Sequence, residues 1–197
     1  MLKSVSCVIA FVLAFLATVH AADKAAAKIG SPAPEFSLKD QNGNAVKLAD
    51  FKGKIIVLEW TNPECPFVQR HYKAQTMTHL AHQYKDKGVV WLAINSNSGD
   101  TTAVNRHWAE QNHLAYPILE DSKGVVGKAY GAKSTPTMAV IDKDGKLVYK
   151  GGIDNDPDGD KSDRVNYVQK ALDEILTGRS VSEPVTKSYG CGVHYEG

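Results

Sequence analysis

Residues 55–60, IIVLEW, constrain the fold of this chain most strongly, because they form a continuous apolar run interrupted only by Glu59. A run of this length without polar alternation is typical of a strand covered on both faces. Shortly after it, Pro66 is suited to the first position of a helix, where its missing N–H costs nothing. Apolar residues then recur at helical spacing until Gly88 can end the helix. The sequence therefore predicts a buried strand followed by one long helix, with Cys65 at their junction.

The rest of the chain alternates between strand and helix patterns. Turn residues at Asn42-Gly43 and at 143–146 predict two hairpins. We also expect strands at 89–97 and 116–119, helices at 102–112 and 122–130, and a final helix whose apolar stripe starts at Val165 and stops before Gly178. Strands that alternate with helices predict an α/β fold with a central mixed sheet flanked by helices.

The N-terminus has the features of a secretory signal peptide. Lys3 gives a basic start, residues 5–19 are apolar, and small residues precede a cleavage point after Ala21. The apolar stretch is shorter than the roughly 20 residues of a membrane-spanning helix, so we expect no stable membrane span after cleavage. An uncleaved anchor is the second interpretation. We predict a secreted or periplasmic protein with a signal peptide over 1–21, a flexible linker over 22–32, a domain over 33–178 and an extended C-terminal tail over 179–197.

The overall charge excludes some classes of partner. The 23 basic and 22 acidic side chains leave a formal net charge of +1. This gives no electrostatic reason to expect a nucleic acid or an anionic membrane as a partner. A chain of 197 residues is long enough for one domain with its own core.

Two of the three cysteines in the sequence are candidates for chemistry. Cys7 would be removed with the signal peptide, which leaves Cys65 and Cys191 in a compartment where disulfides persist. The start of a helix offers unpaired N–H groups and the positive end of the helix dipole, which favour a thiolate. Cys65 is therefore a candidate nucleophile. An inert buried cysteine, or one structural disulfide between the two residues, is the alternative.

Several segments together resemble the thioredoxin-like redoxins. They are APEFSLKDQNGNAVKLADFKGKIIVLEW, NPECPFV, VVWLAINSN, KAYGAKSTPTMAVIDKDGKLVYKGGID and the closing GCGVHY. The sequence is most similar to the peroxiredoxin-like branch of the alkyl hydroperoxide reductase/thiol-specific antioxidant family. The resemblance implies a thioredoxin-like fold in which Cys65 is the attacking cysteine and Thr135-Pro136 forms a cis-proline loop beside it. Val68 stands where a dithiol thioredoxin has its second cysteine, and Ser134 where many relatives carry a further one.

Two other residues complete the predicted site. Cys191 is a candidate resolving cysteine that could reach Cys65 within one chain or across a homodimer, because the tail is long enough to span the domain. A structural or intermolecular disulfide is the alternative use of Cys191. Glu59 interrupts an apolar strand, so it is either a proton shuttle for Cys65 or a carboxylate paired with a lysine or a backbone group.

Metal sites and cofactors are not expected. On a helix, His71 lies on a different side from Cys65, so the two do not readily share an ion. Cys191 and His194 form only a short ligand-like pair. Residues 154–160 match the first half of a calcium loop but have Val165 where the closing glutamate belongs, which favours a solvated acidic loop.

These patterns predict an exported thiol-dependent oxidoreductase. Its single nucleophilic cysteine would carry out peroxide reduction or thiol–disulfide exchange with protein or small-molecule partners. An external thiol would serve as the reductant. The alternative is a non-catalytic thioredoxin-fold binding module or a copper-handling protein.

Overall fold

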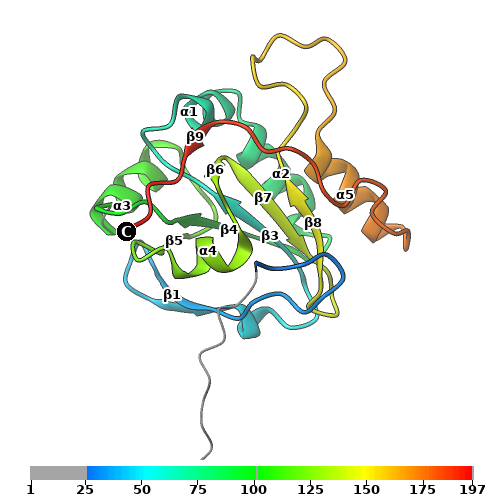
Figure 1. Cartoon of the computed structure of the whole chain (residues 1–197), viewed down its shortest axis with the longest axis horizontal. Coiled ribbons are helices and arrows are strands. Elements are labelled where there is room, and N and C mark those ends of the chain that lie inside the picture. The colour runs from blue at the N-terminus through cyan, green and yellow to red at the C-terminus, as the bar shows by residue number, and fades with distance from the viewer. Residues whose placement is uncertain (1–25, 101, 197) are drawn as a thin grey trace, which may run out of the picture.

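The computed structural model describes residues 26–100 and 102–196 and contains a seven-stranded mixed sheet (Figure 1). The strand order is β2-β1-β5-β4-β3-β7-β8. β3, β4 and β5 run parallel, while β7 pairs with β3 and β1 pairs with β5 in antiparallel fashion. The predicted α/β class with a central mixed sheet flanked by helices is therefore confirmed.

The strands of this sheet are β1 (Ser37–Asp40), β2 (Ala45–Lys47), β3 (Ile55–Trp60), β4 (Val89–Asn95), β5 (Ile118–Glu120), β7 (Thr137–Ile141) and β8 (Leu147–Gly151). A second, two-stranded sheet joins β6 (Ser134–Thr135) to β9 (Cys191–Gly192). The helices are η1 (Leu48–Phe51), α1 (Pro66–Lys73), α2 (Thr76–Lys85), α3 (Thr102–Gln111), α4 (Val125–Tyr130) and α5 (Tyr167–Leu176).

β3 lies inside the sheet, and all six of its residues are buried. Alternate side chains of a strand point to opposite faces, so β3 contributes to two cores. Ile55 and Val57 pack in the core that α1, α2 and α5 cover, and Ile56 and Leu58 pack in the core that α4 covers. This double coverage explains why the sequence of β3 is continuously apolar.

The predicted long helix after Cys65 is wrong, because the chain breaks into α1 and α2. Gln75 adopts a left-handed conformation, with φ at 56°, and separates the two helices. The break redirects α2, so that Met77 and Leu80 are buried in the same core as Tyr72 of α1. Helical spacing of apolar residues continues through the break, which is why the sequence did not reveal it.

The final helix also begins later than its apolar stripe predicts. Asn166 caps α5 by accepting a hydrogen bond from the Gln169 backbone N–H at 2.9 Å. Val165 lies before this cap and is exposed. The predicted strand at 116–119 begins instead at Ile118.

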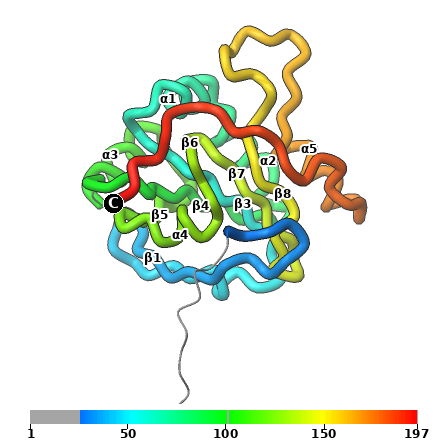
Figure 2. The backbone as a smooth tube through the Cα atoms, in the orientation of Figure 1, coloured from blue at the N-terminus to red at the C-terminus, as the bar shows by residue number. Residues whose placement is uncertain are grey.

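Both ends of the described chain lie against the domain. Near the N-terminus, Ala27 donates a backbone hydrogen bond to Ala129, and Gly30 donates one to Leu147. The tail after α5 runs past α1 to an end beside α3 (Figure 2). The predicted signal peptide lies outside the described residues. Within the described ranges, no helix is long and apolar enough to cross a membrane.

Glu59 is a fully buried carboxyl group in the central strand. One carboxyl oxygen accepts a hydrogen bond from the Tyr72 hydroxyl, and the other accepts one from Trp91 Nε1, each at 2.8 Å. Tyr116 in turn contacts the Tyr72 hydroxyl at 3.1 Å. Burial raises the pKa of Glu59 to about 7, and these hydrogen bonds only partly oppose the rise.

The raised pKa of Glu59 predicts that stability depends on pH. The native state holds the Glu59 proton more tightly than the unfolded chain, whose pKa stays near the ordinary 4.5. Stability from this group is therefore fully present below about pH 4.5 and lost as the pH rises to about 7. The loss amounts to about 3 kcal/mol of unfolding free energy.

Glu59→Gln is expected to remove this pH dependence. Its amide can accept from Trp91 and donate to the Tyr72 oxygen, so the packing is retained. We expect the variant to be more stable than the parent at pH 8, by about 3 kcal/mol, in urea unfolding followed across the pH range. Identical pH profiles for parent and variant would contradict the assignment of this titration to Glu59.

Candidate active site

Cys65 occupies the position just before the first turn of α1. Its backbone is extended, with φ at −77° and ψ at 118°, and Pro66 begins the helix. This geometry brings the backbone N–H of Val68 to the Cys65 sulfur, where it lowers the pKa of the thiol. The unpaired N–H groups of the first helical turn favour a negative charge at this position. The side chain is buried, with only 1% of the residue exposed.

The predicted cis-proline loop lies directly beside Cys65. The Thr135–Pro136 peptide bond is cis. The Cys65 thiol donates a hydrogen bond to the Thr135 carbonyl oxygen at 3.1 Å. The Thr135 hydroxyl is buried without a conventional hydrogen-bond partner in the described part of the chain, and it also lowers the pKa of Cys65. This hydroxyl is available to donate to the sulfur once the thiol has lost its proton.

Cys191 reaches the same site from the tail. β9 pairs with β6 in antiparallel register, so that Cys191 lies opposite Thr135. The thiol and the backbone N–H of Cys191 lie close enough to the Cys65 sulfur to lower the pKa of Cys65. Both cysteines are free thiols in this structure. The pairing of these two short strands thus brings Cys191 to the site of Cys65, although the two cysteines are 126 positions apart in the sequence.

The two thiols differ in acidity. Burial raises the pKa of Cys65, but the donors from Cys191, Thr135 and Val68 outweigh it, so the pKa falls below its ordinary value. Burial and the hydrogen bond to Cys65 raise the pKa of Cys191 to about 11. Cys65 is therefore the more acidic of the two thiols, and Cys191 keeps its proton to higher pH.

Tyr189 anchors the tail on one side of Cys191. Its hydroxyl donates to a carboxylate oxygen of Asp154. Because that proton is committed to Asp154, His71 Nε2–H donates to the Tyr189 oxygen at 2.8 Å. The Tyr189 ring also packs against Phe67 of α1, with 5.9 Å between the ring centroids.

Tyr195 anchors the tail on the other side. Its hydroxyl donates to the Ala132 carbonyl. Its ring lies so close to α4 that a Cβ built on Gly124 would be 2.3 Å from a ring carbon. Just before it, the backbone of His194 donates to the Asn97 side chain at 3.1 Å. Sequence reasoning missed both anchors, because the tail carries no periodic pattern that marks its tyrosines as buried contacts.

Glu59 is not joined to this pair of thiols by a hydrogen bond. Its carboxyl oxygens are both engaged by Tyr72 and Trp91, on the α1 side of the sheet. Of the predicted site residues, the structure thus brings together Cys65, Cys191 and Thr135-Pro136, and places Glu59 in a separate polar cluster. The proton-shuttle role of Glu59 remains a prediction.

The remaining polar candidates have structural partners. Within residues 26–100 and 102–196, no group of three or more His, Cys, Asp or Glu side chains is placed to hold a metal ion. In the acidic loop, one Asp156 carboxylate oxygen accepts backbone N–H groups from Gly159, Asp160 and Lys161. Arg70 donates to the backbone carbonyls of Asp156 and Pro157, so its charge is directed at this loop.

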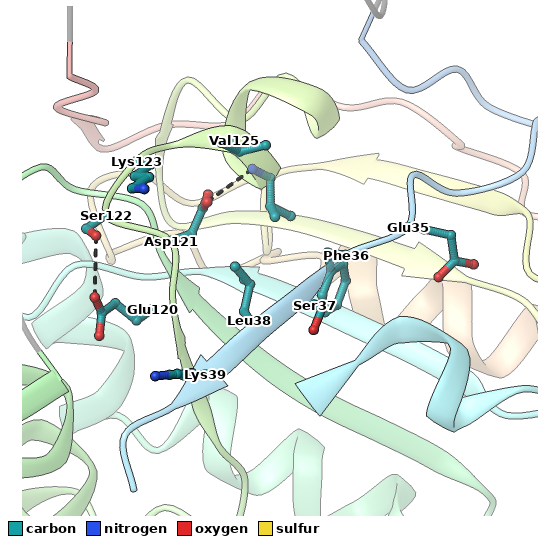
Figure 3. A pocket seen from close by; sticks show the side chains of 11 residues that line it. Glu35, Phe36, Ser37, Leu38, Lys39, Glu120, Asp121, Ser122, Lys123 and Val125 are labelled. Atoms are coloured by element: carbon teal, nitrogen blue, oxygen red, sulfur yellow. Dashed lines mark hydrogen bonds between the residues drawn. The ribbon is translucent and has the colours of Figure 1, made fainter. Parts of the chain in front are cut away.

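A separate surface pocket lies between β1 and the start of α4 (Figure 3). It is lined by Phe36, Leu38 and Val125 together with charged side chains such as Lys39 and Glu120. None of the predicted site residues lines this pocket. The pocket is therefore distinct from the pair of thiols.

Comparison with known proteins agrees with this geometry. The sequence model of the redoxin family matches residues 28–168. The thiol-disulfide oxidoreductase ResA of Bacillus thuringiensis subsp. konkukian is 34% identical over 121 residues, which cover 61% of this chain and 68% of that protein.

Solved structures extend the similarity over more of the chain. An uncharacterised conserved protein from Geobacillus kaustophilus has a TM-score of 0.79 and 33% identity, covering 86% of this chain and 93% of that one. A hypothetical protein from Sinorhizobium meliloti has the same TM-score of 0.79 with 28% identity, covering 87% of this chain and 97% of that one. Because the family match covers more than half of the sequence, this chain belongs to the redoxin family and has its thioredoxin-like fold.

Proposed function

We propose that this protein is an exported thiol–disulfide oxidoreductase whose redox centre is the pair Cys65 and Cys191. The observation that carries the proposal is the strand pairing that places Cys191 opposite Thr135, the residue whose carbonyl oxygen accepts a hydrogen bond from the Cys65 thiol. The redoxin domain and the relatives named thiol-disulfide oxidoreductases support the same chemistry. The substrates are protein or small-molecule disulfides, and an external thiol restores the reduced pair.

The reaction is a balanced two-electron exchange. In the reductive direction, the two protein thiols become one Cys65–Cys191 disulfide, and an external disulfide becomes two thiols. Each step is the attack of a thiolate on a disulfide sulfur, with the electron pair leaving on the displaced sulfur. The groups around the Cys65 sulfur, Cys191 and Thr135 foremost, lower its pKa and so favour the thiolate in this exchange.

Peroxide reduction is the competing chemistry that the resemblance to peroxiredoxins suggested. Those proteins hold an arginine against their thiolate. Here Arg70 instead donates to the carbonyls of Asp156 and Pro157. This engagement of Arg70 favours disulfides over peroxides as substrates.

Serine variants test the redox pair. We expect Cys65→Ser to abolish the reduction of a disulfide such as oxidised glutathione, because the thiolate is lost. Cys191→Ser is expected to lower turnover at least about tenfold, because no internal disulfide can form. The first readout is the rate at which thiol is released from oxidised glutathione. The second is the intact mass of the oxidised parent, which falls by the hydrogens of the Cys65 and Cys191 thiols when the disulfide forms.

Cys191→Ser with parental turnover, or an oxidised parent that lacks the Cys65–Cys191 link in peptide maps, would refute the redox pair.

Substrate preference is tested by parallel rate measurements. We expect the reduced protein to react with a disulfide at least about tenfold faster than with hydrogen peroxide at equal concentration. The measurement is stopped-flow tryptophan fluorescence or acid-quenched thiol counting. A faster reaction with peroxide would reverse the assignment.

Export predicts a processed N-terminus. We expect the mature protein to begin at Ala22 and to be recovered from the secreted or periplasmic fraction after expression of the full sequence. N-terminal sequencing and intact mass measure this directly. A membrane-bound product that retains residues 1–21 would instead support the uncleaved anchor.

A further inference from the structure

The two cysteines differ sharply in their access to solvent. Cys65 is 1% exposed, although it has the lower pKa. Cys191 lies on the tail above it and is partly exposed. Cys65 is therefore the more acidic thiol but is shielded from solvent. Cys191 is accessible but keeps its proton to higher pH.

The cover over Cys65 is closely fitted. Gly190 has φ at 119°, a conformation that favours glycine, and a Cβ built on it would lie 2.0 Å from the Thr135 carbonyl oxygen. β9 then continues the contact by pairing with β6. The anchors Tyr189 and Tyr195 hold the tail on both sides of this segment. An outside molecule can thus reach Cys65 only by displacing a strand that is anchored at both ends.

We propose that an external thiol reduces the oxidised protein by attacking Cys191, and that Cys65 is the sulfur displaced. The inference rests on the proposed redox pair and specifies which of its two sulfurs the external thiol attacks. It makes the tail strand β9 the contact surface for the partner's sulfur.

The chemistry of reduction by an external thiol follows this order. The external thiolate attacks the exposed Cys191 sulfur of the Cys65–Cys191 disulfide, the bond between the two protein sulfurs breaks, and its electron pair leaves on Cys65. A second external thiolate attacks the external sulfur of the mixed disulfide and releases Cys191, which takes up a proton. Two external thiols have then become one external disulfide, and the protein has gained two electrons.

Leaving-group acidity supports the same order. Displacement is faster when the departing thiol has a low pKa. Attack on Cys191 expels Cys65, whose pKa is held below its ordinary value by its hydrogen-bond donors. Attack on Cys65 would expel Cys191, whose pKa is about 11. Access and leaving-group acidity thus select the same sulfur.

Trapping of the mixed disulfide tests this order in the full oxidised protein. The protein is oxidised, its internal disulfide is confirmed by peptide mapping, and it is then treated briefly with reduced glutathione and quenched with acid. We expect glutathione on Cys191 and a free Cys65. Glutathione on Cys65 would overturn the inference while leaving the redox pair intact, whereas failure to form the internal disulfide would refute the redox pair itself.

Two glycine variants test the role of the cover. In a Cys191→Ser background, Gly190→Ala would place its methyl group against the Thr135 carbonyl and lift the tail, while Gly192→Ala meets no atom within 4 Å. We expect oxidised glutathione to modify Cys65 roughly tenfold faster with Gly190→Ala and at an unchanged rate with Gly192→Ala. Equal rates in all three proteins would show that the tail does not limit access to Cys65.

Discussion

The pairing of β9 with the cis-proline strand β6 is the interaction on which the rest of the site depends. It places Cys191 opposite Thr135, beside the Cys65 sulfur, where Cys191 lowers the pKa of Cys65. The start of α1 supplies one N–H donor to this sulfur, and the tail supplies the thiol and the backbone N–H of Cys191. Neither segment alone makes the site, because each carries only one of the two cysteines.

In a dithiol redoxin, both cysteines lie at the start of the same helix. In this protein the two cysteines lie on separate segments. Here Val68 stands three residues after Cys65 and is buried in the core, where it contributes packing and a backbone donor. The second thiol is carried instead on a strand that also covers the first. In this structure the tail is held by hydrogen bonds and two tyrosine anchors. In the proposed redox cycle, oxidation adds a covalent bond between the tail and Cys65.

Sequence patterns predicted the sheet well, because a strand buried on both faces such as β3 must be apolar throughout. They also placed Cys65 at a helix start, because Pro66 marks that position. They missed the break at Gln75, since the apolar spacing continues across it, and they extended α5 back to Val165, since the cap at Asn166 is a local hydrogen bond rather than a hydrophobic signal.

The tail was the least predictable part of the site. Its contacts are made by a two-residue strand and by isolated tyrosines, and such contacts depend on the folded surface beneath them rather than on periodicity. Chain length showed that Cys191 could reach Cys65, but only the structure shows the register that pairs Cys191 with Thr135. Glu59 illustrates the opposite case, because its burial was evident from the sequence while its partners Tyr72 and Trp91 were not.

Titration of the thiols tests most directly whether the tail stabilises the Cys65 thiolate. Ultraviolet absorbance of the thiolate can be followed against pH in the mature protein and in Cys191→Ala. In the parent, the Cys65 transition is expected below the ordinary cysteine range, well separated from that of Cys191, whose pKa is raised to about 11. In Cys191→Ala the Cys65 transition is expected to move to higher pH, because its thiol donor is lost. A Cys65 transition that stays at the same pH in the variant would contradict the pairing of the tail with the nucleophile.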